Sequence, residues 1–136
     1  MKKKKYILIV PIVVLIVSII VICYILLTKV DKVNDIVNLN AVNKIVLMDG
    51  ANGDLVEVTD EQQKKNIINS LDKLELKKYN GEDEDGWIFA IMLGTDNAEI
   101  KLTFRSVEKC IDSKGNEYII KNVDDNMKNL CNCFLN

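Results

Sequence analysis

Residues 87–104, WIFAIMLGTDNAEIKLTF, contain the clearest strand pattern of this chain. Residues 87–93 are apolar at every position, as in a central strand that is covered on both faces. Residues 98–104 alternate apolar with polar side chains, which is typical of a strand with one face in water. The turn residues 94–97 lie between them. The two strands are therefore predicted to pair as a hairpin in an antiparallel sheet.

Further hairpins are predicted on both sides of this stretch. Residues 44–48 and 55–58 are aliphatic runs joined by Asp-Gly-Ala-Asn-Gly-Asp, a strong turn signal. Residues 107–111 and 116–121 flank the turn Asp-Ser-Lys-Gly in the same way, and a short strand is predicted over residues 76–79. The hairpins together predict one antiparallel sheet of about six strands.

Two helices are predicted in the same domain. Thr59 and Gln62 have the spacing of a capping box, and the apolar residues that follow share one helical face, which predicts a helix over residues 60–73. A second helix is predicted over residues 123–135 from its apolar stripe. The fold class is therefore α+β, with both helices on one face of the sheet.

The first thirty residues predict a membrane anchor. Four lysines at residues 2–5 precede 22 residues without a charge, residues 6–27, which reach about 33 Å as a helix and match a hydrocarbon core of about 30 Å. Because lysines favour the cytoplasmic side, the helix is predicted to cross the cell membrane once, with the N-terminus in the cytoplasm and the remaining chain outside. A lipoprotein signal ending at Cys23 is the alternative. We prefer an uncleaved anchor, because Ile22 stands where such signals carry a small residue.

Three segments follow from this division of the chain. Residues 1–28 hold the cytoplasmic lysines and the anchor, residues 29–41 form a juxtamembrane connector, and residues 42–136 form the extracytoplasmic domain. Val30, Val33 and Val37 have helical spacing, so the connector is expected to continue the membrane helix.

Composition narrows the possible functions. Without the four N-terminal lysines, 14 of the 18 Lys and Arg stand against 20 Asp and Glu, a net charge of −6 that argues against a nucleic-acid partner. Histidine is absent, which removes the most common general base and the imidazole ligands of zinc. We therefore expect no catalytic residues, no metal and no cofactor.

Two clusters nevertheless invite a chemical interpretation. Cys110 and Cys131 are candidates for a disulfide, because the outer domain faces an oxidising compartment; the alternative is that both thiols are reduced. The acidic loop of residues 82–85 invites calcium, yet placing Gly86 at the glycine position of an EF-hand loop puts Gly81 and Met92 where acidic ligands are needed. A solvated loop is the simpler interpretation.

The central strands are apolar on both faces, although two helices can cover only one. Ile88 and Met92 alternate with the other apolar side chains of their strand, as Val46 and Met48 do in theirs. These four residues are predicted to form a surface for a protein partner or for self-association.

The overall layout resembles a group of bacterial surface domains. A lysine-tipped anchor, the strand IVLMDGANG, the helix opening VTDEQQ and the hairpin DSKGNEYII are similar to the small, N-terminally anchored extracytoplasmic domains of unknown function in low-GC Gram-positive bacteria. The resemblance implies an α/β surface domain and supplies no catalytic residues. The sequence thus favours a membrane-tethered interaction or sensor module, an accessory or immunity-type partner of another envelope protein. A cell-envelope hydrolase or redox enzyme is the alternative.

The lysines before the span give a first testable prediction. A reporter enzyme that is active only outside the cytoplasm is expected to be active when fused after Asn136, because the four lysines hold the N-terminus inside. Activity of a reporter that works only in the cytoplasm, fused at the same position, would contradict this orientation.

Overall fold

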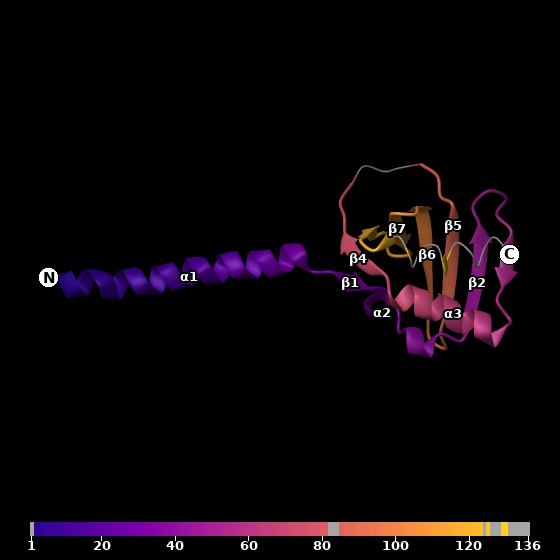
Figure 1. Cartoon of the computed structure of the whole chain (residues 1–136), viewed down its shortest axis with the longest axis horizontal. Coiled ribbons are helices and arrows are strands. Elements are labelled where there is room, and N and C mark those ends of the chain that lie inside the picture. The colour runs from indigo at the N-terminus through magenta and orange to yellow at the C-terminus, as the bar shows by residue number, and fades with distance from the viewer. Residues whose placement is uncertain (1, 82–84, 124, 126–128, 131–136) are drawn as a thin grey trace.

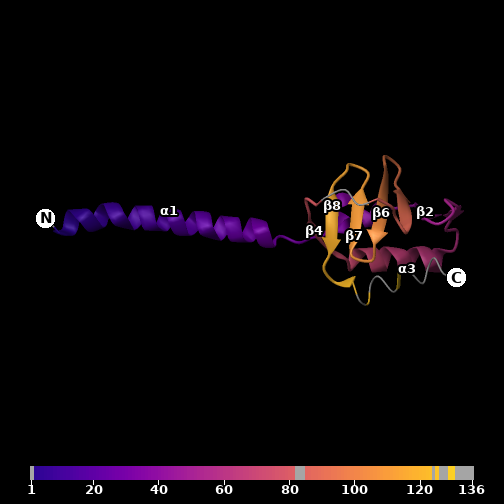
Figure 2. The ribbon, with the colours of Figure 1, turned by 90° about the horizontal axis from the view of Figure 1, so that it is seen from above.

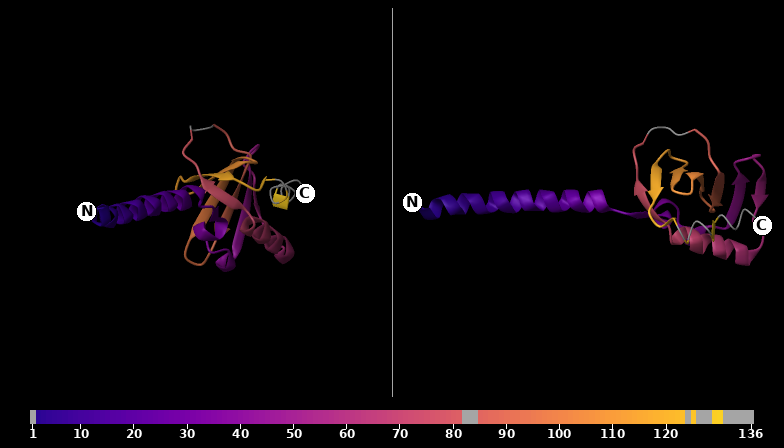
Figure 3. Two further views of the ribbon diagram at one scale, coloured as in Figure 1. Left: turned by 60° about the vertical axis from the view of Figure 1, so that its left-hand side comes forward. Right: turned by 45° about the horizontal axis from the view of Figure 1, so that its top comes forward.

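The protein is described by a computed structural model over residues 2–81, 85–123, 125 and 129–130. A long helix, α1 (Lys2–Thr28), leads into one body that lies wholly at its end (Figures 1 and 3). That body is built on an eight-stranded sheet in which every pairing is antiparallel, in the order β1-β4-β8-β7-β6-β5-β2-β3. The strands are β1 (Asp31–Lys32), β2 (Lys44–Asp49), β3 (Leu55–Glu57), β4 (Glu75–Lys78), β5 (Phe89–Gly94), β6 (Glu99–Ser106), β7 (Lys109–Asp112) and β8 (Glu117–Ile120).

The α+β class is confirmed, but the sheet has eight strands rather than about six. The three predicted hairpins are present as β2–β3, β5–β6 and β7–β8. Seven of the eight strands match segments predicted as strands, and the eighth is β1, which is two residues long and pairs with β4. Two residues are too few for an alternating pattern, so only tertiary contacts identify this strand.

Helix α3 (Glu61–Asp72) lies close to its predicted bounds but has a different cap. The side chain of Asp60, rather than that of Thr59, accepts a hydrogen bond of 2.7 Å from the backbone N–H of Gln63. Ile67 and Leu71 of this helix are fully buried. The helix crosses the strands on one side of the sheet (Figure 2).

The hydrophobic core lies between α3 and that side of the sheet. Ile45, Ile91 and Phe104 of the three central strands are fully buried there, and the rings of Phe89 and Phe104 stack with centroids 4.5 Å apart. The short helix α2 (Val33–Ile36) and the 3-10 turn η1 (Leu39–Ala41) contribute to the same core. Two helices therefore lie on one face, as predicted, but one of them is α2 rather than the predicted helix over residues 123–135.

The connector does not continue the membrane helix as expected. Helix α1 ends at Thr28, and β1 begins at Asp31 after two residues. Val33, Val37 and Leu39 are buried in the core with exposures of 0, 7 and 3%. Of the three valines whose spacing suggested a longer membrane helix, Val33 and Val37 are therefore buried in the domain, whereas Val30 is 40% exposed.

The predicted C-terminal helix falls largely outside the described residues. Val123, Asp125, Asn129 and Leu130 are helical, and the side chain of Leu130 is fully buried. Val123 is partly buried against the core. Of this segment's described residues, Val123 and Leu130 thus pack against the core that α3 covers.

The buried connector gives a prediction about truncation. A chain that begins at Asp31 is expected to fold, whereas one that begins at Val42 is expected to lose on the order of 5 kcal/mol of unfolding free energy. Each buried valine or leucine contributes about 1.5–3 kcal/mol, and the second chain lacks three of them. Urea unfolding followed by circular dichroism measures the difference. Equal unfolding midpoints would show that residues 31–41 are dispensable.

Candidate functional site on the open face of the sheet

The candidate site lies on the sheet face opposite to α3, which we call the open face. In the register of β2 and β5, Val46 lies directly opposite Met92 and Met48 opposite Ala90. Ile88 continues the alternation of Ala90 and Met92, and its carbonyl accepts a 3.0 Å hydrogen bond from the N–H of Gly50. The structure thus brings the four predicted residues Val46, Met48, Ile88 and Met92 to one face.

Gly50 is required at this point because the two chains approach closely. A Cβ at Gly50 would lie 2.5 Å from the carbonyl oxygen of Trp87 and 2.6 Å from that of Ile88. Any side chain there would push residues 87–88 away from the end of β2. The position of Ile88 on the open face therefore depends on this glycine.

The apolar residues of the open face differ in exposure. Ile88 is 43% exposed, whereas Val46, Met48 and Met92 are half-buried and Ala90 is buried. Leu55 of β3, which is 59% exposed, lies directly opposite Met48 and extends the group. We call these residues the apolar half of the open face: Val46, Met48, Leu55, Ile88, Ala90 and Met92.

Sequence analysis missed Leu55, although a signal was present. Leu55 and Glu57 occupy one face of β3, and Val56 occupies the other. The three-residue strand is too short for that alternation to stand out from the adjoining turn. Only its pairing with β2 shows that Leu55 joins the apolar half.

The remaining strands make the other half of the open face polar. Lys101 and Thr103 of β6 lie opposite Met92 and Ala90. Further along, Arg105 and Glu117 form an ion pair of 3.7 Å, and the ammonium group of Lys109 lies 5.3 Å from the centre of the Tyr79 ring. The open face is therefore divided between an apolar half and a second half in which polar and charged side chains surround the half-buried Ile111 and Ile119.

A hollow of about 260 Å³ lies at the end of the polar half. It is lined by residues 78–81, Ile111 and the turn residues 115–117. Its one acidic side chain, Glu117, is paired with Arg105. The hollow thus offers a polar recess beside Tyr79, without a cluster of acidic or thiol groups among its described residues.

The carboxylate of Asp112 lies on the core side, is 5% exposed and accepts four hydrogen bonds. Its Oδ1 accepts hydrogen bonds from the backbone N–H groups of Lys114 (2.9 Å) and Asn116 (3.0 Å). Its Oδ2 accepts from the Asn116 amide (3.0 Å) and from the Tyr118 hydroxyl (3.2 Å). Burial alone would raise the pKa of Asp112, but these bonds outweigh it and hold the pKa below its usual range.

Asp112 also affects its neighbours. Burial, together with the negative charge of Asp112, raises the pKa of the Cys110 thiol to about 12. The same two causes raise the pKa of Tyr118. A thiol with so high a pKa is protonated at neutral pH and is a poor nucleophile. The role of Asp112 is therefore structural: its hydrogen bonds stabilise the turn between β7 and β8.

The predicted disulfide stays a prediction. Cys110 forms no disulfide with a described residue and is buried, at 2% exposure, on the core side of β7. Its proposed partner, Cys131, lies outside the described residues. Leu130, which precedes Cys131 in sequence, is buried in the same core as Cys110.

Residues 82–84 of the acidic loop also lie outside the described residues. Two acids of the β2–β3 turn accept hydrogen bonds within that turn: Asp49 from the N–H of Ala51 (2.8 Å) and Asp54 from the Asn52 amide (2.9 Å). In the part of the chain that the structure describes, no three His, Cys, Asp or Glu side chains come together as a metal site. The described acids therefore provide no calcium site.

Comparison with known proteins adds information on the fold alone. No protein-family model and no curated protein matches the sequence. A crystal structure of a presumed lipoprotein from Clostridium perfringens is similar, with a TM-score of 0.54 over 77% of this chain and 95% of that one. The identity is 17%, so the similarity concerns the fold. Its source is a low-GC Gram-positive bacterium, which agrees in part with the resemblance drawn from the sequence.

The hydrogen bonds of Asp112 give a prediction with a defined pH dependence. Asp112→Asn is expected to lower the unfolding free energy by about 2–3 kcal/mol at pH 7, because an amide cannot accept the same set of bonds. The folded pKa is depressed, so the carboxylate's contribution is complete above its unfolded pKa of about 4 and is lost as the pH falls through the folded value.

Urea unfolding between neutral pH and about pH 3 tests this. The gap between native chain and variant should narrow in the acid range. Asp72→Asn is the control, because Asp72 is exposed at the end of α3. A gap that does not change with pH would show that Asp112 stabilises the fold only by its shape.

Proposed function

We propose that the chain is a membrane-tethered interaction module of the cell envelope, which binds another envelope protein through the apolar half of its open face. In this proposal the domain binds a partner and does not catalyse a reaction. The supporting observation is that Ile88 and Leu55 remain 43 and 59% exposed on a face that no helix of the described residues covers.

Energetics favour covering this surface. Contact between apolar side chains and water is unfavourable by about 25 cal/mol per Å². The half-buried Met48 lies directly opposite the exposed Leu55, and Val46 and Met92 lie opposite each other in the neighbouring row, so a partner could bury them together. Methionine adapts its shape to a partner more easily than branched side chains do. Interfaces with a central apolar group and a charged border are common, and the polar half supplies such a border.

The tether in this proposal is α1. Its segment Ile9–Thr28 has a mean hydropathy of 3.3 and is not buried against the rest of the chain. The lysines before it favour an N-terminus in the cytoplasm and a domain outside. The similar Clostridium perfringens structure is named as a lipoprotein, a class attached to membranes, and this supports an envelope location.

Charged substitutions on the apolar half test the proposal. A photo-crosslinking amino acid at Leu55 is expected to form an adduct with a second protein in intact membranes, because this position is exposed beside Met48. Ile88→Asp and Met92→Lys should each reduce the adduct by at least tenfold, since a buried unpaired charge at an interface is strongly unfavourable.

Thr103→Asp is the matched control, because it introduces a charge on the same face but in the polar half. It should leave the adduct unchanged, and circular dichroism should show all three variants folded. If Ile88→Asp and Met92→Lys both unfold the domain, the apolar half is ordinary core and the proposal fails. An adduct made of two copies of this chain would show that the apolar half serves self-association rather than the binding of another protein.

A further inference from the structure

The edge of the sheet formed by β1 and β4 is the part of the domain that lies nearest to α1 (Figure 1). Two residues, Lys29 and Val30, separate the end of α1 from β1. At about 3.5 Å per residue they hold Asp31 within roughly 10 Å of Thr28. Neighbouring strands are about 4.8 Å apart, so β4 lies within about 15 Å of the end of the helix.

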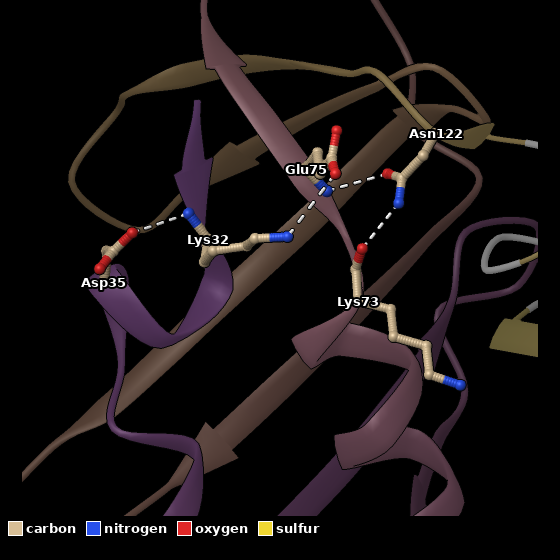
Figure 4. A network of polar contacts seen from close by, with 5 residues as sticks. All are labelled: Lys32, Asp35, Lys73, Glu75 and Asn122. Atoms are coloured by element: carbon tan, nitrogen blue, oxygen red, sulfur yellow. Dashed lines mark hydrogen bonds and ion pairs between the residues drawn. The ribbon is translucent and has the colours of Figure 1, made fainter. Parts of the chain in front are cut away.

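Polar contacts attach this edge firmly to the domain (Figure 4). The Lys32 ammonium group lies 3.8 Å from the Glu75 carboxylate, and the backbone N–H of Lys32 donates to Asp35 at 2.8 Å. The side chain of Asn122 accepts from the N–H of Glu75 (2.9 Å) and donates to the carbonyl of Lys73 (2.6 Å). The chain that leaves the helix, β4 and the segment after β8 are thereby joined.

Positive charge is concentrated at this edge. We define the proximal edge as residues 29–35, residues 72–78 and Lys121, whose backbone N–H donates to Glu75. It contains six lysines and four acids, a net charge of +2, within an outer chain of net charge −6. The remainder therefore carries −8. Among the described residues, the ammonium groups of Lys77, Lys78 and Lys121 form no ion pair.

We infer that the proximal edge binds the anionic lipid headgroups of the membrane in which α1 is anchored, an inference that rests on the proposed anchor. The headgroup region is about 5–8 Å deep on each side of the hydrocarbon core, and the Debye length is about 8 Å in physiological salt. Lysines held within about 15 Å of the helix end therefore lie within reach of lipid phosphates. The more acidic remainder of the domain is repelled by the same surface.

This contact sets the orientation of the domain relative to the membrane. Strands β5 and β2 are five and six places from β1 in the sheet order, which puts the apolar half about 25–30 Å from the proximal edge. A domain that rests on its proximal edge therefore presents the apolar half well above the lipid. The partner in the proposed function would then need a part that projects to this height.

Resonance energy transfer from Trp87, the one tryptophan of the chain, to labelled headgroups can measure how far the domain extends above the membrane. The full-length chain is placed in nanodiscs that carry dansyl-labelled headgroups, either in phosphatidylcholine alone or with phosphatidylglycerol added. In anionic discs the upright domain should hold Trp87 away from the surface and give low transfer efficiency. In neutral discs the domain can pivot on its two-residue tether, and the transfer efficiency should rise.

Two triple variants separate specific binding from general charge. The proximal variant Lys77→Gln, Lys78→Gln, Lys121→Gln should shift the docked equilibrium in anionic discs by about a hundredfold, since each lysine near such a surface contributes roughly fivefold. Its transfer efficiency should then rise to the neutral value. The control variant Lys44→Gln, Lys65→Gln, Lys101→Gln removes the same charge elsewhere and should retain the low efficiency.

Other results would overturn the inference. Transfer that is unchanged in the proximal variant, or changed equally in both variants, would show that the proximal lysines do not bind the lipid. Failure of the chain to enter nanodiscs would instead reject the anchor, and with it the proposed function. These two failures are recorded by different measurements, so they remain distinguishable.

Discussion

The pairing of β5 with a strand on each side determines which residues form the core and which form the open face. This strand pairs over its whole length with β2 on one side and with β6 on the other. On its core side, Phe89, Ile91 and Leu93 are buried, and Phe89 stacks on Phe104 of the next strand. Because successive side chains of a strand point to opposite faces, burying these residues forces Ala90 and Met92 onto the open face. The apolar half is therefore a direct consequence of how the core is filled.

The order of the strands then separates two chemically different regions. β4 pairs with β8 and β1 rather than with β5. The two strands follow one another in the chain but lie four places apart in the strand order of the sheet. Consequently β1 and β4, with their lysines, lie at the anchored edge, and the β2–β3 hairpin lies at the opposite edge (Figure 1). Consecutive strands of the chain, β4 and β5, thus belong to different regions: β4 to the edge with the lysines, and β5 to the apolar half of the open face. Composition alone does not show this separation.

Sequence reasoning succeeded where a pattern repeats over several residues. The alternation over residues 98–104, the three hairpins and helix α3 were all predicted close to their observed bounds. It failed at β1 and at the connector, because Val33 and Val37 have a spacing that fits a lipid-facing helix and a core-facing one equally well. The four predicted surface residues share a face, since strand alternation determines which way they point. Leu55 and the Asp112 cluster required the tertiary structure, because their contacts depend on register and turn geometry rather than on periodicity.

The short tether gives the proposed functions a common physical basis. A domain joined to a membrane helix by a long flexible linker could move beyond the reach of the headgroup charges. Here β1 begins two residues after α1 and is held by pairing with β4, so the proximal edge stays close to the helix end. The edge and the apolar half belong to one continuous sheet, and a sheet joined by backbone hydrogen bonds transmits orientation from one edge to the other. Charge at the anchored edge can therefore determine where an apolar surface on distant strands is presented, without any contact between the two.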